Sequence, residues 1–250
     1  VGPPQTQPPV PTPFHAQQRP VVLIHSAAGG VGLYALTMTI RMGGIPICTV
    51  SGRQKREYLI RRFHLLPEQV IDRSLCGHLR VQHIPTAPKN TWLSHLKYNL
   101  RLLSRFITSP IKSILDKTIC FRRKQAKDYS FLLSYALKTI GATSIDISLD
   151  SLLGAFFSPT LQLMSSHNSK VIVFGAGSYT TNSDYPDYLQ IGLEYIRRPV
   201  IDPLELIPSN VSICGFNLIW LWDRIYELYG LLTIIKTLVP VPITPLTVFG

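Results

Sequence analysis

Residues 21–32, with the sequence VVLIHSAAGGVG, constrain the fold of this chain more than any other stretch. A short apolar run leads into small residues and three glycines, and residues 33–45 follow with the composition of a helix. A buried strand, a tight turn and a helix N-terminus in this order can cradle a phosphate group. The spacing from Ala27 through Gly29 to Gly32 matches a GxGxxG fingerprint with alanine in first place, which is weak evidence by itself.

Two of these glycines predict close approaches of the backbone. Because it has no side chain, Gly29 allows the main chain to reach a pyrophosphate, and Gly32 allows the helix to pack close to the strand. The remaining chain must then supply the other strands that a dinucleotide site requires.

Five further apolar runs follow the first, at residues 45–50, 70–72, 144–150, 170–177 and 211–217. Strands that alternate with helices require a parallel sheet with right-handed crossovers. Since the glycine turn follows the first strand, we predict an α/β fold with a doubly wound, six-stranded Rossmann sheet in the order 3-2-1-4-5-6. Helices are expected at 128–141, 151–164 and 218–238, and residues 177–210 are expected to form an irregular excursion over a ligand.

The formal net charge of +11 is concentrated in one segment. Residues 77–127 contain eleven lysines and arginines and one acidic residue, whereas the remainder of the chain is nearly neutral. Residues 92–114 place apolar residues at helical spacing with cations between them, so we interpret 75–126 as a basic helical insertion. It can be an insertion of no defined function, a surface that docks on an acidic membrane or a partner, or sequence that is not natural coding. Its few aromatic residues argue against nucleic acid as a partner.

The end of the second apolar run distinguishes between the two nicotinamide dinucleotides. A fold that binds NAD places Asp or Glu there to hold the ribose 2′-hydroxyl. This chain instead has Ser51 and Gly52, followed by the cations Arg53, Lys55 and Arg56. A hydroxyl and cations would bind the 2′-phosphate that a carboxylate would repel, so NADP is the predicted cofactor. The alternative is a solvated basic first turn of a helix, although cations there oppose the helix dipole.

These patterns divide the chain into three parts. Residues 1–18 are predicted to be a proline-rich tail or linker, 19–240 an NAD(P)-binding Rossmann domain that carries the insertion, and 241–250 a truncated return segment. The four cysteines have neither metal-ligand nor disulfide spacing, so we expect reduced thiols and no metal. No run of 18 uncharged apolar residues occurs, and we expect a cytoplasmic location, with membrane association through the insertion left open.

Five segments, in order along the chain, resemble the cofactor-binding half of the medium-chain dehydrogenases/reductases: HSAAGGVG, SGRQKRE, IDISLDSLLG, KVIVFGAG and ICGFNL. The likeness is greatest to the zinc-independent quinone-oxidoreductase group. Within that group, PVIDPLELIPSNVSICGFNL resembles the vesicle amine transport protein branch. Enoyl reductase domains of polyketide synthases share the AAGGVG motif. The resemblance covers residues 19–74 and 127–240 and leaves out the basic insertion.

The resemblance implies a role in cofactor binding for each matching position. One group would surround the pyrophosphate, a second would hold the 2′-phosphate and adenosine end, and a third would line the cleft and contact the nicotinamide side. These groups are Ala28, Gly29, Gly30 and Val31; Ser51, Lys55 and Arg73; and Gly175, Ala176, Phe216 and Asn217. Phe216 has core packing as its alternative. No catalytic residue is assigned, because His25 is better explained as a satisfied strand-end histidine than as an acid or base.

The expected function is therefore that of an NADPH-dependent oxidoreductase that transfers a hydride from the nicotinamide to a small quinone or enone. A homodimer is a further expectation. The resemblance also implies an N-terminal GroES-like catalytic domain, in whose place this sequence has the proline-rich residues 1–18, so we expect a fragment. The alternative function is a non-catalytic nucleotide-binding or membrane-associated module.

Overall fold

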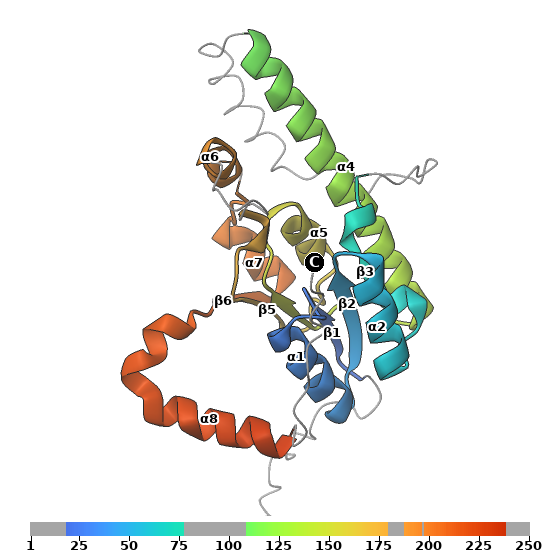
Figure 1. The fold of residues 1–250 in the computed structure, drawn as a ribbon, viewed down its shortest axis with the longest axis vertical. Helices are drawn as coiled ribbons and strands as arrows, with labels where there is room; N and C mark the ends of the chain where they lie inside the picture. Colours follow the sequence, from blue (N-terminus) through green and yellow to red (C-terminus); the bar gives the residue numbers. More distant parts are fainter. Residues whose placement is uncertain (1–18, 78–108, 180–187, 197, 239–250) are drawn as a thin grey trace, which may run out of the picture.

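A sheet of six parallel strands forms the centre of the molecule (Figure 1). The computed structural model describes residues 19–77, 109–179, 188–196 and 198–238. The strands are β1 (Val21–Ile24), β2 (Ile45–Val50), β3 (Val70–Asp72), β4 (Ile147–Asp150), β5 (Ser169–Val173) and β6 (Val211–Gly215). Their order is β3-β2-β1-β4-β5-β6, so the predicted doubly wound sheet is confirmed.

Helices connect the strands and follow the last one. The α-helices are α1 (Gly30–Arg41), α2 (Arg53–Phe63), α4 (Ser109–Thr139), α5 (Phe157–Gln162), α6 (Tyr188–Ile196), α7 (Pro203–Ser209) and α8 (Ile225–Leu238). Short 3-10 turns are η1 (Pro67–Gln69), η2 (Arg73–Leu75), η3 (Gly154–Phe156), η4 (Gly177–Tyr179) and η5 (Leu218–Arg224).

Each face of the sheet has its own core, because successive side chains of a strand point to opposite faces. Val22 and Ile24 of β1 pack with Leu33 and Leu36 of α1 and with Leu59 of α2. The opposite face of the same strand packs against α4 and η3. A smaller cluster joins β5 and β6 to α5. The four-residue β1 is buried along its whole length, which explains its continuous apolar sequence.

Helix α4 is longer than the sequence pattern indicates. It begins at Ser109, whereas the expected helix begins at residue 128, so the end of the basic segment is continuous with a helix of the fold (Figure 1). Its second half holds it to the sheet, because Tyr129, Leu133 and Ala136 recur at helical spacing and are all fully buried. Residues 78–108 of the predicted insertion lie outside the described residues, as do 1–18 and 241–250.

The C-terminal elements also differ from the expectation. Residues 151–164 form a short 3-10 turn and the six-residue α5, because Leu153 and Gly154 have positive φ angles of 59° and 64° that interrupt a helix. The expected excursion at 177–210 contains α6 and α7. Residues 218–238 form η5 and then α8, which stands away from the sheet (Figure 1). Within the described residues, no helix is long and apolar enough to span a bilayer.

The packing of α4 on the sheet predicts the effect of two substitutions on one helix. Leu133 is 0% exposed, so Leu133→Ala is expected to lower the free energy of unfolding by about 2–5 kcal/mol. Phe131 is 37% exposed, and Phe131→Ala is expected to cost less than about 1 kcal/mol. Urea unfolding followed by circular dichroism measures both. Equal losses would show that α4 does not pack on the sheet through this face.

Candidate cofactor-binding site

The turn between β1 and α1 is tied to the two strands beside β1. The amide of His25 donates to the carbonyl of Leu149 (3.0 Å), and the amide of Ala27 donates to the carbonyl of Thr49 (3.0 Å). Ser26 has a φ of 53°, in the left-handed region, and accepts a hydrogen bond from the amide of Gly29 (2.9 Å). The chain can therefore reverse within four residues and start the helix directly above the sheet.

The first turn of α1 is open to an anion. Gly29 is the N-cap, no side chain caps the helix, and the first turn contains no acidic residue. The first intrahelical bond runs from the amide of Leu33 to the carbonyl of Gly29 (2.9 Å), so the amides before Leu33 have no partner within the helix. Gly30 is exposed and Val31 is 66% exposed, whereas Ala28 is buried beneath them. Such an N-terminus attracts phosphate through its amides and through the helix dipole.

Gly32 allows the helix to lie against the turn. A Cβ atom at this position would stand 2.5 Å from the carbonyl oxygen of Ser26 and 2.6 Å from the Cα of Ala27. At Gly30 a Cβ would meet no atom within 4 Å. The predicted role of Gly32 in close packing is therefore confirmed, whereas Gly30 faces open space.

These two glycines form a matched pair for a stability test. Gly32→Ala is expected to lower the free energy of unfolding by about 1–3 kcal/mol, because the added methyl group forces α1 away from the turn. Gly30→Ala is expected to change it by less than about 1 kcal/mol, because alanine is favourable in a helix and meets no neighbour. Thermal and urea unfolding of both variants test this difference. A Gly32→Ala variant as stable as the parent would contradict the observed packing.

The residues predicted for the 2′-phosphate lie at the end of β2, and two of the cations there are already engaged. Arg53 donates from Nε to Glu57 at 2.7 Å, and Arg56 donates to the carbonyls of Val70 and Pro67. Ser51 is exposed and Lys55 is half-buried in the first turn of α2. Lys55 makes no ion pair with any residue that the structure describes, so its charge is available to a ligand.

Asp72, at the end of β3, is a neighbouring carboxylate that the sequence analysis missed. Its Oδ1 accepts hydrogen bonds from the amide of Gly52 (2.9 Å) and from the amide and hydroxyl of Ser74. Burial by itself would raise the pKa of this carboxyl, but the hydrogen bonds from Gly52 and Ser74 outweigh it and hold the pKa below the ordinary value. Asp72 thus fixes the loop after β2.

Arg73 is directed into the protein rather than toward the predicted adenosine end. Its guanidinium carbon lies 5.5 Å from the centre of the Phe156 ring, in a cation–π contact. Its Nε is buried without a hydrogen-bond partner among the described residues. Burial lowers the pKa of Arg73, and the charge is partly balanced by groups that include Asp72 and Asp150.

The loops after β4 and β5 are bonded to one another. The amide of Gly177 donates to the carbonyl of Ser151 (2.9 Å), and the amide of Ser178 donates to the carbonyl of Leu152 (3.0 Å). A Cβ on Gly175 would stand 2.9 Å from the oxygen of Ser151, so only glycine allows this approach. Gly175 and Ala176 therefore lie beside the loop after β4, at the edge where they were expected.

Phe216 and Asn217 follow the edge strand β6. Phe216 is 48% exposed, which is more than core packing would leave. The side-chain oxygen of Asn217 accepts from the amide of Ile219 (3.1 Å) and caps η5. Its side-chain amide group can still donate to a ligand.

All the predicted site residues therefore follow the carboxyl ends of five parallel strands, which share one edge of the sheet (Figure 1). In such sheets ligands bind outside this edge, where the strand order reverses between β1 and β4. Arg73 alone among them is turned inward. Across the described residues, no group of histidine, cysteine and acidic side chains could hold a metal ion.

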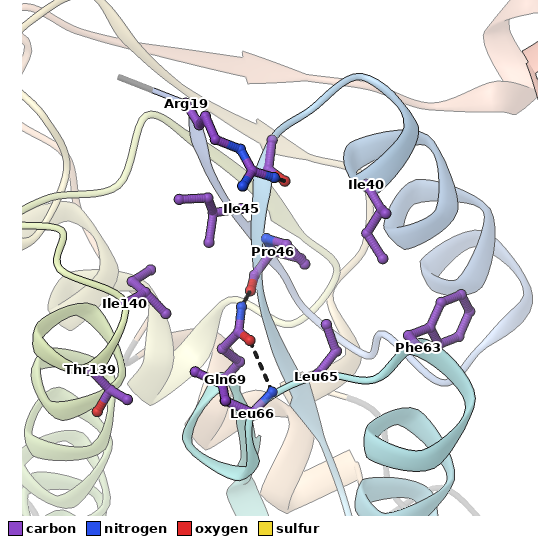
Figure 2. Close-up of a pocket in the computed structure, with 11 residues that line it drawn as sticks. Arg19, Ile40, Ile45, Pro46, Phe63, Leu65, Leu66, Gln69, Thr139 and Ile140 are labelled. Carbon is purple, nitrogen blue, oxygen red and sulfur yellow. Dashed lines mark hydrogen bonds between the residues drawn. The ribbon is translucent and has the colours of Figure 1, made fainter. Parts of the chain in front are cut away.

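A cavity at the opposite edge of the sheet, beside the start of β2, is lined mainly by apolar side chains (Figure 2). Its volume is about 470 Å³, and apolar side chains such as Ile40, Phe63 and Ile140 line it. Gln69 donates to the carbonyl of Pro46 (2.8 Å) and accepts from the amide of Leu66 (3.0 Å) (Figure 2). Because Gln69 is thus occupied within the protein, we do not assign the cofactor to this cavity.

His25, the last residue before the turn, is 1% exposed. Its Nδ1 lies 3.1 Å from the hydroxyl oxygen of Thr49. Burial, with a smaller contribution from Arg73, lowers the pKa of His25 to about 4, although Asp150 acts in the opposite direction. The imidazole is therefore neutral at pH 7. The expected satisfied strand-end histidine is only half satisfied, because Nδ1 is paired and Nε2 is buried without a hydrogen-bond partner among the described residues.

This lowered pKa predicts acid sensitivity. The folded state binds the His25 proton less readily than the unfolded state, so stability is complete above the unfolded pKa of 6.5 and is lost as pH falls toward about 4. The loss attributable to this group is up to about 3 kcal/mol. Urea unfolding between pH 8 and 4 is expected to show it, and His25→Gln is expected to reduce it. An unchanged pH profile in the variant would contradict the assignment.

No protein-family model matches this chain. A highly reducing polyketide synthase of Hypocrea virens is 40% identical over 58 residues, which are 23% of this chain and 2% of that protein. Another, of Alternaria alternata, is 44% identical over 50 residues, which are 20% of this chain and 2% of that protein. The chain thus spans only a small fraction of the length of these curated relatives.

Many solved structures resemble this chain, and two of them illustrate the shared fold. A structure assigned as the enoyl reductase domain of a polyketide synthase has a TM-score of 0.50 and 17% identity, with 94% of this chain and 90% of that chain covered. The nucleotide-binding subdomain of the enoylreductase domain of PpsC from Mycobacterium tuberculosis has a TM-score of 0.50 and 19% identity. The match covers 89% of this chain and 83% of that chain. At this level of identity the likeness shows the fold alone.

Proposed function

We propose that this chain binds NADPH across the carboxyl edge of its sheet and takes part in the reduction of an activated carbon–carbon double bond or a quinone. The observation that carries the proposal is the open, uncapped N-terminus of α1 directly after the Ser26–Gly29 turn. The residues present fit a dinucleotide, because exposed amides, a glycine whose Cβ position faces open space and a cation lie along the edge where such ligands bind.

The residues have separate roles in this proposal. Ala28, Gly29, Gly30 and Val31 surround the pyrophosphate; Ser51 and Lys55 hold the 2′-phosphate; Gly175, Ala176, Phe216 and Asn217 line the nicotinamide side. Arg73 acts from within the protein, by its positive charge, rather than by contact with the adenosine. When bound, the cofactor supplies the hydride, and the chain supplies position and electrostatic complementarity.

The similar proteins indicate which substrate would accept the hydride. The curated matches are polyketide synthases and the structural neighbours are enoyl reductase domains, which supports an α,β-unsaturated thioester or related enone as substrate. The segment around PVIDPLELIPSNVSICGFNL, by its resemblance to the vesicle amine transport protein branch, supports a quinone and a zinc-independent reaction. Exposed apolar side chains on α8, which stands away from the sheet, support a homodimer, which sedimentation equilibrium would test.

The 2′-phosphate site predicts which substitutions change cofactor choice. Lys55→Ala is expected to weaken NADPH binding by about tenfold and to leave NADH binding within about twofold, because one charge-assisted contact is lost. Ser51→Asp is expected to weaken NADPH binding further, because the carboxylate repels the phosphate. Fluorescence titration of the nicotinamide measures both affinities.

Arg62→Ala is the matched control, because this cation lies in the last turn of the same helix and is exposed. It is expected to leave both affinities unchanged. Equal affinity of the parent chain for NADH and NADPH would contradict the phosphate site. Tight NADPH binding without consumption of NADPH in the presence of a quinone or an unsaturated thioester would favour the non-catalytic module.

A further inference from the structure

A row of buried polar side chains crosses three neighbouring strands beneath the turn. In the parallel register Ile24 lies level with Cys48 of β2 and with Leu149 of β4, so the next residues, Thr49, His25 and Asp150, share one level. They belong to the face that α4 covers, since side chains alternate between faces along each strand. Each of the three is at most 1% exposed.

The hydrogen bonds within this row leave one side-chain atom of His25 and one of Asp150 without a partner. Oδ1 of Asp150 accepts from the amides of Leu152 (2.7 Å) and Leu153 (2.9 Å), and Nδ1 of His25 is paired with the Thr49 hydroxyl. Nε2 of His25 and Oδ2 of Asp150 are buried without a hydrogen-bond partner among the described residues. Buried polar atoms are nearly always paired, with protein or with an internal water.

We propose that this row binds one internal water between His25 Nε2 and Asp150 Oδ2, and that the water-linked row holds the Ser26–Gly29 turn in the form that receives the pyrophosphate. The positioning role rests on the proposed function; the water site does not. Neighbouring strands of a sheet lie about 4.8 Å apart, so two polar side chains at one level that are not directly bonded can be joined by one water molecule.

The donors and acceptors then form one consistent chain. The Thr49 hydroxyl donates to Nδ1 of His25, Nε2–H donates to the water, and the water donates to the Asp150 carboxylate. Burial of His25 and the positive charge of Arg73 from η2 favour a neutral ring, and Asp150 from β4 opposes them without outweighing the burial. Tyr129 from α4, with its ring centre 6.0 Å away, and Cys76 after η2 complete the titratable surroundings. Burial raises the pKa of the Cys76 thiol to about 12, so Cys76 is also uncharged at pH 7.

The row is connected to the turn through its own backbone. The carbonyl of Thr49 accepts from the amide of Ala27, and the amide of His25 donates to the carbonyl of Leu149, the neighbour of Asp150. A change in the spacing of the row therefore displaces both ends of the turn. His25 is a positioning residue, since its side chain is buried beneath the turn and would act on a ligand only through the backbone.

Nitrogen-15 NMR of the histidine rings tests the water site without any cofactor. The parent chain is expected to show His25 as the Nε2–H tautomer at pH 7, with a cross-peak from Nε2–H to water. Asp150→Asn keeps an oxygen for the amides of Leu152 and Leu153 but replaces the second acceptor with a donor, so the tautomer is expected to change to Nδ1–H. An Nδ1–H tautomer in the parent, a missing water cross-peak or an unchanged tautomer in the variant would overturn the proposal.

Two substitutions at His25 test the positioning role. Asparagine can replace Nδ1 but not Nε2, whereas glutamine can replace Nε2; both keep a polar group. His25→Asn is expected to weaken NADPH binding about tenfold, and His25→Gln less than about threefold, with similar unfolding midpoints. Equal losses of affinity would overturn the positioning role. Absence of NADPH binding in the parent would instead refute the proposed function, and the NMR result on the water site would stand.

Discussion

The position of β1 between β2 and β4 determines the geometry of the whole site. Because β1 is a central strand, the turn after it finds hydrogen-bond partners on both sides, at Thr49 and at Leu149. Gly32 then brings α1 directly onto this turn, at a distance that no Cβ could occupy. The N-terminus of the helix is consequently fixed relative to the sheet, as a site that offers backbone amides to an anion requires.

The sequence predicted the elements that have strong local signals. Alternating apolar runs and helical patterns led to the six strands and their order, since a parallel sheet with right-handed crossovers permits few topologies. The glycine turn was also correctly placed, and the helix after it was predicted with shifted bounds, since α1 runs from Gly30 to Arg41 rather than over 33–45. The start of α4 at Ser109 was not predicted, because its basic composition is typical of a solvated segment and gives no sign that the helix continues into the fold. The break at Leu153 was missed because apolar periodicity does not report a positive φ angle.

The roles of buried polar residues depend on register, which single-sequence patterns do not supply. Thr49 and Asp150 are far apart in the chain and become neighbours of His25 only through the pairing of β1 with β2 and β4. The resemblance placed Arg73 near the adenosine end of the cofactor, yet its side chain lies against the ring of Phe156. Asp72 was missed for the same reason: a carboxylate was sought only at the end of β2, and the next strand supplies one to the same loop.

Asp72 bears on cofactor choice because its carboxylate lies beside the loop at the end of β2. A free carboxylate beside the end of β2 would oppose a 2′-phosphate, and at about 4 Å in water each unit charge would contribute about 1 kcal/mol. Here three hydrogen bonds from Gly52 and Ser74 already converge on Oδ1 of Asp72, and the side chain is buried. The carboxylate therefore acts as a structural anchor for the loop. Arg53 and Arg56 are likewise engaged, with Glu57 and with backbone carbonyls. Among these residues, the groups still free to contact a ligand at this end of the sheet are consequently Lys55 and the Ser51 hydroxyl, which is a smaller and more selective set of donors than the basic sequence suggests.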